Sequence, residues 1–276
     1  MAAPETLPRT HRHALWTFAG ASLLTIGIGA AVMLATGVPV SIAIRNPIAW
    51  VVAGAFAIFS AGRGWLGGWS TPTAVIVIAL SFVGSGQQGV HRWLDLGPVQ
   101  LNAAALLLPL AIATFLRTQA TLAVTSFLAI AALLAWQPDI SQLAGLVPAA
   151  LILVHARFGG RGLAIAAAVC AATVALCLSR TDPLAPVAHV EGIFALAWSQ
   201  SPALALAMAA SLAAAVLSPF LLRPAHPGAL ALAAYFTATA IAPMFGAYPV
   251  PLAGYGLSFV IGWWLAIAAL SAKKNA

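Results

Sequence analysis

Long apolar runs, separated by short stretches that contain proline, glycine or a charge, follow one another along the whole chain. A helix that crosses a bilayer needs about 20 mainly apolar residues, and most runs approach or reach this length. The pattern predicts an all-α membrane protein, a polytopic bundle of about ten transmembrane helices. The expected spans are 14–36, 47–62, 71–86, 101–116, 119–136, 140–157, 161–178, 200–222, 226–247 and 252–271.

The composition agrees with a membrane protein and leaves no room for a separate soluble domain. Hydrophobic residues make up 62% of the chain and charged residues 6%, whereas a soluble domain carries roughly a quarter charged residues. We therefore expect a single transmembrane domain over 1–276. Its main polar parts are an N-terminal tail at 1–13 and a short outer loop at 179–199.

The charges predict the orientation of the bundle. Loops on the cytoplasmic side of a membrane carry an excess of Lys and Arg, and a cytoplasmic N-terminus gives nine such residues inside and three outside, with both termini in the cytoplasm. The inner set is Arg9, Arg12, Arg63, Arg117, Arg157, Arg161, Arg223, Lys273 and Lys274, and the outer set is Arg45, Arg92 and Arg180.

The net charge of +7 does not indicate a nucleic-acid partner, because the cations stand singly between apolar runs and form no patch. Cys170 and Cys177 lie seven residues apart within one apolar run and are interpreted as packing residues. We find no metal-ligand spacing among Cys and His and no nucleotide-binding loop, which argues against a primary pump.

Carboxylates gather on the predicted outer side. Glu5 lies inside, whereas Asp95, Asp139, Asp182 and Glu191 all lie outside. Each alone is explained by nearby water, but together they make the outer face the expected place of any chemistry, since ionisable groups near the membrane are costly and are often functional.

Two outer segments carry candidate residues before the sixth span. In the loop at 87–98, Arg92 and Asp95 are three residues apart and could close an ion pair over one turn, with Trp93 as an interfacial anchor. Asp139 follows Pro138 and could cap the next helix, while still facing an outer cavity. A structural and a functional reading remain open for each segment.

The outer loop at 180–191 brings Arg180, His189 and Glu191 close together in sequence. Glu191 stands where the polar loop gives way to an apolar run, so desolvation would raise its pKa and suit it to act as a base; a plain helix-start glutamate is the alternative. Before the last span, prolines and glycines at 248–258 predict broken helix around a cavity that Tyr255 and Ser258 face. Close helix packing is the alternative there.

These segments resemble the SEDS family (shape, elongation, division and sporulation), typified by RodA and FtsW. The sequence GVHRWLDLG at 89–97 is similar to the family's Gly-x-x-Arg-Trp-Leu-x-Leu-Gly, QPD at 137–139 to its Gln-Pro-Asp, and PVPLAGYGLS at 249–258 to its Pro-Leu-Pro-x-x-Ser-Tyr-Gly-Gly-Ser. AHVEGIFA at 188–195 looks like its His-Thr-Asp-Phe-Ile-Phe-Ala. The chain departs from the family at 102–105, where NAAA stands in place of Gln-Pro-Ser-Glu.

The resemblance implies a peptidoglycan glycosyltransferase of the bacterial cytoplasmic (inner) membrane that polymerises lipid II. It places Glu191 at the catalytic carboxylate and implies a class B penicillin-binding protein as partner, in addition to membrane lipids. Arg92 or Arg180 would steady the departing pyrophosphate, with a divalent cation (Mg²⁺ or Mn²⁺) as a possible aid. The other expected substrate-binding residues are Trp93, Asp95, Asp139, His189, Tyr255 and Ser258. A non-catalytic scaffold that binds lipid II or the partner, and a transporter or flippase of a lipid-linked substrate, are the alternatives.

Overall fold

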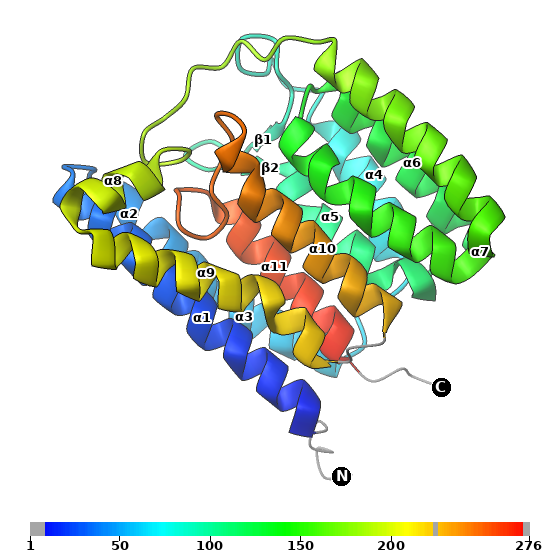
Figure 1. The fold of residues 1–276 in the computed structure, drawn as a ribbon, viewed down its shortest axis with the longest axis horizontal. Helices are drawn as coiled ribbons and strands as arrows, with labels where there is room; N and C mark the ends of the chain where they lie inside the picture. The colour runs from blue at the N-terminus through cyan, green and yellow to red at the C-terminus, as the bar shows by residue number, and fades with distance from the viewer. Residues whose placement is uncertain (1–8, 223–225, 273–276) are drawn as a thin grey trace.

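The structure is a computed structural model and describes residues 9–222 and 226–272. Within these residues it is a bundle of helices with one small hairpin of two strands (Figure 1). The helices are α1 (Arg9–Ala35), α2 (Val40–Ala43), α3 (Arg45–Gly62), α4 (Ser70–Leu80), α5 (Ala103–Thr114), α6 (Ala120–Trp136), α7 (Ile140–Leu178), α8 (Ile193–Gln200), α9 (Pro202–Leu222), α10 (Pro227–Ile241) and α11 (Leu257–Ser271). Two 3₁₀ turns, η1 (Phe115–Arg117) and η2 (Ala242–Met244), extend α5 and α10.

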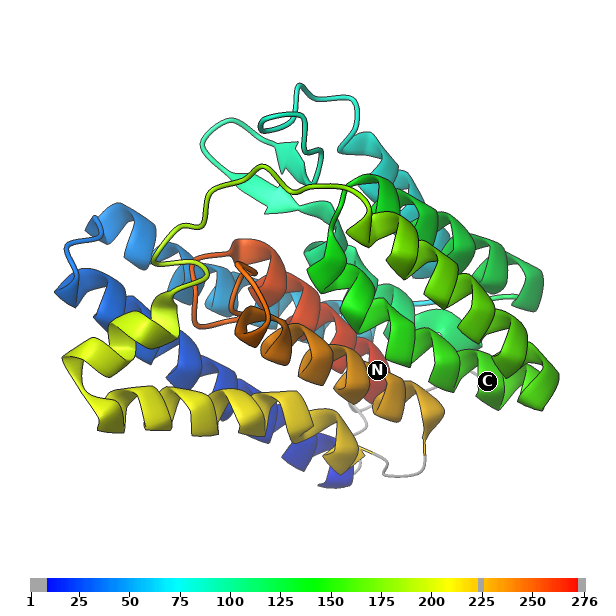
Figure 2. The ribbon, with the colours of Figure 1, turned by 45° about the horizontal axis from the view of Figure 1, so that its top comes forward.

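A sharp reversal divides α7 into two antiparallel arms (Figures 1 and 2). Gly159 at the reversal has φ 68°, a left-handed conformation that favours glycine. We call residues 140–158 the first arm and residues 160–178 the second arm. The two arms correspond to the two spans expected at 140–157 and 161–178.

The expected number of crossings is confirmed. Five helical stretches of the described chain are long and apolar enough to cross a membrane, and four shorter apolar helices accompany them. Because α7, one of the five, folds back on itself, the chain runs through the bundle ten times. The five long stretches are His13–Ala35, Val40–Gly62, Ile140–Leu178, Pro202–Leu222 and Pro227–Met244, and the shorter ones are Ser70–Leu80, Ala103–Arg117, Ala120–Trp136 and Leu257–Ser271.

The boundaries differ from expectation in several places. The span expected at 71–86 is shorter, because α4 ends at Leu80. The tail expected at 1–13 is already helical from Arg9, and helix α8 occupies the end of the loop expected at 179–199. The last helix begins at Leu257 instead of residue 252, because residues 251–255 form turns around Pro251. The loop after α4 contains the strands β1 (Trp93–Asp95) and β2 (Gln100–Asn102), which pair antiparallel with Trp93 opposite Asn102. These strands add backbone hydrogen bonds to a loop that has few apolar residues to bury.

Helix α11 occupies the centre of the bundle and packs against α3 and α5. Gly262 lies so close to α5 that a side chain there would overlap the carbonyl oxygens of Ala105 and Leu106. On another face of α11, the indole of Trp264 packs on Gly54 of α3. Small residues at such crossings allow the close backbone approach on which helix association in membranes depends.

The two sides of the bundle carry different elements. The hairpin, the loop 179–192 and the turns at 251–255 lie at one end, whereas α1 begins and α11 ends at the other (Figures 1 and 2). We take the hairpin end as the outer side, because the positive-inside bias of the Lys and Arg residues predicts this orientation. Residues 1–8 of the expected tail, including Glu5, and the inner cations Arg223, Lys273 and Lys274 lie outside the described residues.

Candidate functional site

Arg92 is the central residue of the outer polar region and immediately precedes β1. Its side chain is 10% exposed. Its Nη2 atom donates to Asp182 Oδ2 at 2.7 Å and to the carbonyl oxygen of Pro138 at 2.5 Å. Its Nε atom donates to the carbonyl oxygen of Gln137 at 3.3 Å and lies 3.9 Å from Asp139 Oδ2. Since a buried charge is costly unless it is paired, Arg92 holds together the hairpin, the end of α6 and the long outer loop.

Asp139 caps helix α7, as expected. Its Oδ1 atom accepts hydrogen bonds from the backbone N–H of Gln142 at 3.3 Å and from the Ser141 hydroxyl at 2.9 Å. Its Oδ2 atom faces Arg92 and accepts from the Asn102 amide at 3.3 Å. Asn102 in turn caps α5 through the N–H of Ala105. Asp139 is 2% exposed, so it serves the buried junction between two helices and does not open onto the outer surface.

The expected ion pair between Arg92 and Asp95 is wrong. Residues 93–95 form a strand, in which successive side chains point to opposite faces, so the one-turn helical geometry that the pair requires is absent. Asp95 is exposed and accepts from the backbone N–H of Gly97 at 3.0 Å in the hairpin turn. Trp93, on the same strand, is half-buried.

Glu191 lies in the turn that leads into α8 and is half-buried. Its Oε2 atom accepts a hydrogen bond from the backbone N–H of Val187 at 2.6 Å. Burial is the main cause that raises the pKa of this carboxyl, and the negative charge of Asp182 adds to it, while hydrogen bonds from backbone N–H groups oppose the rise. The Glu191 carboxylate is therefore more basic than an exposed glutamate, as the sequence predicted.

The Glu191 turn is bound to the segment before α11 through backbone hydrogen bonds. The N–H of Val250 donates to the carbonyl of Val190 at 3.2 Å, and the N–H of Tyr255 donates to the carbonyl of His189 at 2.9 Å. The rings of His189 and Tyr255 lie 6.2 Å apart. Two segments that are distant in sequence and that both carry candidate residues thus form one unit.

Arg45 and Asn46 support this unit, and the sequence analysis did not single them out as site residues. Arg45 Nη1 donates to the Tyr255 hydroxyl at 2.9 Å and to the carbonyl of Pro98 at 3.1 Å. The Asn46 side chain donates to the carbonyl of Gly254 at 2.8 Å and accepts from the N–H of Gly256 at 3.2 Å. The sequence does contain a feature that could have identified them. An Arg–Asn pair stands at the outer end of an apolar span, where polar side chains are expected to have partners.

A cavity of about 640 Å³ opens beside Glu191 between α8, α9 and α10. Apart from Glu191 and Thr237, its walls are built from apolar side chains and glycine, including Phe194, Leu212 and Val216. A carboxylate at the edge of an apolar cavity suits an amphiphilic ligand with a long hydrocarbon part. Tyr255 and Ser258 do not line this cavity, and Ser258 is buried in the first turn of α11.

A second, polar cavity of about 420 Å³ lies on the outer side next to the end of the second arm. Its walls include Gln88, Gly89, Trp136 and Arg180. The Arg180 guanidinium stacks 4.3 Å from the centre of the Trp136 ring, a cation–π contact. Neither Arg180 nor Arg45 forms a salt bridge with a carboxylate in the described part of the chain.

The outer carboxylates do not form a prepared metal site. Within residues 9–222 and 226–272, no group of three or more His, Cys, Asp and Glu side chains is placed to hold a metal ion. Asp139 and Asp182 both pair with the single cation Arg92. The divalent cation that the family resemblance implies stays a prediction, since Mg²⁺ is usually held by one or two carboxylates together with substrate phosphates.

The fold and the outer site together define a polytopic helical membrane protein with a polar outer region beside an apolar cavity. Its fold is that of the rod shape determining protein RodA of Thermus thermophilus: the crystal structure matches with a TM-score of 0.65 over 92% of this chain and 94% of that chain, at 18% sequence identity. A crystal structure of an aspartate-to-alanine mutant of that protein matches with the same TM-score and identity, over 92% and 95%. No protein-family model and no curated protein matches the sequence.

Proposed function

We propose that the chain is a SEDS-type peptidoglycan glycosyltransferase that polymerises lipid II at the outer face of a bacterial cytoplasmic membrane. Three lines of support converge: the RodA fold, the motif resemblance at 89–97, 137–139 and 249–258, and the location of the candidate residues on the outer side. A role in cell shape or division follows from the same resemblance.

The observation that carries the proposal is the position of Glu191. Its carboxylate has a raised pKa and lies at the edge of the apolar cavity of about 640 Å³. A lipid-linked sugar needs this combination, because its polyprenyl chain requires an apolar surface while its sugar hydroxyl requires a base at the membrane boundary.

Glu191 acts in this proposal as a general base. Its carboxylate takes the proton from the acceptor sugar hydroxyl as that oxygen attacks the anomeric carbon of the donor. A carbon–oxygen bond forms between the sugars, and the bond from the anomeric carbon to the pyrophosphate breaks. Undecaprenyl pyrophosphate leaves with the electron pair, and the proton passes from Glu191 to water.

The arginines of the outer side take different roles. Arg92 is buried and bonded to Asp182 and to two backbone carbonyls, so we assign it the positioning of the outer loop. Arg180 lines the polar cavity and Arg45 contacts Tyr255 beside the Glu191 turn. These two cations, without a carboxylate partner in the described chain, are the ones we propose for the pyrophosphate, since interactions with developing charge lower the barrier.

The remaining expected contacts stay part of the proposal. Trp93, Asp95, His189 and Tyr255 lie at the outer end of the bundle, where they would contact the sugar and peptide parts of lipid II. Ser258 and Asp139 are buried and would act by holding these segments in place. A class B penicillin-binding protein is the proposed partner.

Polymerisation of lipid II by the purified protein, with and without a co-expressed class B penicillin-binding protein, tests the proposal. Glu191→Gln is expected to reduce the rate at least about 100-fold, because general-base catalysis contributes that much. Glu191→Asp keeps a carboxylate and is expected to retain part of the activity. Ser199→Ala is the matched control, since this exposed hydroxyl of α8 bonds only to its own helix.

The alternatives give different results in the same preparation. A scaffold would show no polymerisation while binding lipid II or co-purifying with the penicillin-binding protein. A transporter would move labelled lipid-linked substrate across proteoliposomes. Full polymerase activity in Glu191→Gln would remove Glu191 from the mechanism.

A further inference from the structure

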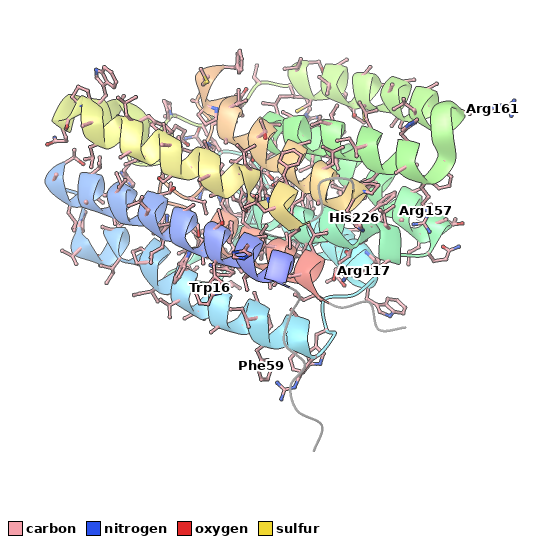
Figure 3. The ribbon with its side chains drawn as sticks, turned by 60° about the horizontal axis from the view of Figure 1, so that its bottom comes forward. Trp16, Phe59, Arg117, Arg157, Arg161 and His226 are labelled. Atoms are coloured by element: carbon pink, nitrogen blue, oxygen red, sulfur yellow. The ribbon has the colours of Figure 1, made fainter. Side chains whose placement is uncertain are left out.

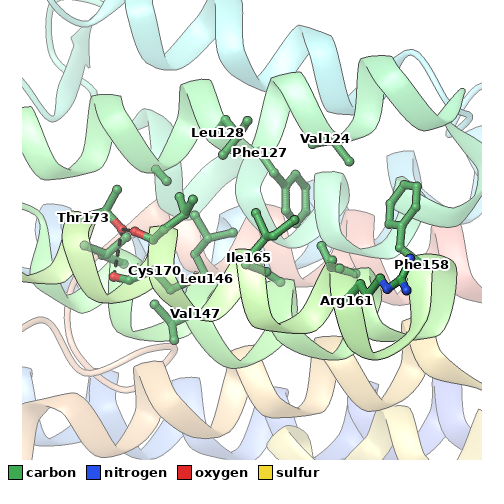
Figure 4. Close-up of a pocket in the computed structure, with 17 residues that line it drawn as sticks. Val124, Phe127, Leu128, Leu146, Val147, Phe158, Arg161, Ile165, Cys170 and Thr173 are labelled. Carbon is green, nitrogen blue, oxygen red and sulfur yellow. Dashed lines mark hydrogen bonds between the residues drawn. The ribbon is translucent and has the colours of Figure 1, made fainter.

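The second arm of α7 stands apart from most of the bundle. Its residues are largely exposed, in contrast to the first arm, which packs against α10. A groove of about 460 Å³ lies between the second arm, the first arm and α6 (Figure 4). It is independent of the outer site, because none of the candidate residues described above lines it.

The lining of the groove is almost entirely apolar. Phe127 and Leu128 of α6, Leu146 and Val147 of the first arm, and Ile165 of the second arm contribute to its walls. The hydroxyl of one lining residue, Thr173, is satisfied by the carbonyls of its own helix at 3.0 Å. The groove therefore offers an apolar surface with little polar competition.

One end of the groove carries a cation. Arg161 lines the groove at the start of the second arm, is exposed, and has no hydrogen-bond or ion-pair partner in the described chain (Figure 4). This end belongs to the inner face, which Figure 3 shows with Arg117, Arg157 and Arg161 labelled. All carboxylates in the described part of the chain lie on the outer side, so no acidic side chain there competes for Arg161.

The length of the groove indicates which kind of ligand it can bind. From Arg161 to Thr173 the second arm rises about 18 Å at about 1.5 Å per residue, close to the ~15 Å of hydrocarbon in one leaflet. An extended hydrocarbon chain suits an apolar groove of this length, with its charged head beside Arg161.

We propose that the groove binds an anionic phospholipid of the cytoplasmic leaflet, with one acyl chain between α6 and the second arm and the phosphate at Arg161. Four features of the groove favour this ligand: the positive charge of Arg161, the absence of nearby carboxylates, the apolar lining and the length. The acyl chain fills the space that separates the second arm from the bundle. The second arm leads directly into the loop of Arg180 and Asp182, so the lipid supports the position of the outer loop.

Native mass spectrometry of the delipidated full-length protein, titrated with dioleoyl phosphatidylglycerol or dioleoyl phosphatidylcholine, tests this proposal. We expect one phosphatidylglycerol to bind more tightly than phosphatidylcholine. Arg161→Gln should weaken phosphatidylglycerol binding about five-fold, the effect of losing one cation at the membrane surface. It should weaken phosphatidylcholine binding less, because the choline cation offsets the charge of the phosphate that Arg161 contacts. Inorganic phosphate alone should not compete.

Two further variants separate the groove from general surface charge. Ala166→Phe adds bulk to the groove without changing charge and should remove the bound lipid. Arg63→Gln is the matched control, because Arg63 stacks 3.6 Å from the Phe59 ring on α3 and does not line the groove. Equal binding of both lipids, an unchanged affinity in Arg161→Gln, or retention of the lipid in Ala166→Phe would each overturn the proposal.

Discussion

Arg92 is buried together with the carboxylate of Asp139, while Asp182 reaches it from the outer loop. The side chain of Asp139 is 3% exposed and that of Asp182 31% exposed. If Arg92 is removed, water can therefore solvate the carboxylate of Asp182 more readily than the buried carboxylate of Asp139. The difference gives each member of the cluster a distinct effect on stability.

Arg92→Ala is expected to lower the free energy of unfolding by about 3 kcal/mol, because it leaves Asp139 buried without its cation. Asp182→Ala should cost less than about 1 kcal/mol, since that pair is partly solvated. Chemical unfolding of the detergent-solubilised protein measures both. Equal losses in the two variants would contradict the assignment of Asp139 as the dependent partner.

Glu191 predicts a pH dependence of both rate and stability. A general base works only when deprotonated, so the polymerisation rate should rise with pH through a pKa above the ordinary 4.5. Because the folded protein binds this proton more tightly than the unfolded chain, Glu191 makes stability fall as pH rises from 4.5 to the raised pKa. Above that pKa, Glu191→Gln should be at least as stable as the unchanged protein.

Rate profiles and unfolding curves recorded at the same pH values check this prediction. Glu191→Asp should keep a rising rate limb, displaced along the pH axis. A rate limb that persists unchanged in Glu191→Asp, or a loss of stability in Glu191→Gln at neutral pH, would assign the titration to another group.

Two elements of the bundle depend on backbone geometry more than on hydropathy. The reversal at Gly159 uses a left-handed conformation to turn one long helix into two arms. The hairpin at 93–102 brings Arg92 and Asn102 together, and the N–H of Ala103 donates to the carbonyl of Arg92 at 3.0 Å. The loop thereby delivers a cation and an amide to the same carboxylate, that of Asp139.

The crossing of α11 and α5 depends on Gly262. Gly262→Val is expected to cost about 3 kcal/mol or to prevent folding, because its side chain would meet the carbonyls of Ala105 and Leu106. Gly27→Ala on α1 is the control, because apart from the adjoining residues and backbone of its own helix no atom lies within 4 Å of the added methyl group. Thermal unfolding and size-exclusion chromatography compare the two; similar behaviour would show that this crossing tolerates a wider separation.

The whole molecule has two chemically different ends. Its described carboxylates lie at the outer end, and arginines dominate the inner end (Figure 3). The outer end can therefore hold a buried ion-pair network and a basic carboxylate, while the inner end can attract anionic lipid. The match to RodA at 18% identity shows that the same helix arrangement forms from two sequences that share few residues. Helix packing in membranes needs small residues at crossings more than particular side chains.

Hydropathy was enough to predict the ten passes, because bilayer thickness acts on each span separately, and the order of the spans placed the described carboxylates at one end of the bundle. The direction of the bundle in the membrane stays a prediction from the positive-inside bias. The cap by Asp139 also followed from its position after Pro138. The partners of the charges did not follow. Arg92 bonds to Asp182 across 90 residues, and Arg45 to Tyr255 across 210; local spacing instead suggested Asp95. Such pairs depend on which spans are neighbours in the bundle. An apolar run in the sequence indicates that a helix lies in lipid, but it does not indicate which other helix it packs against.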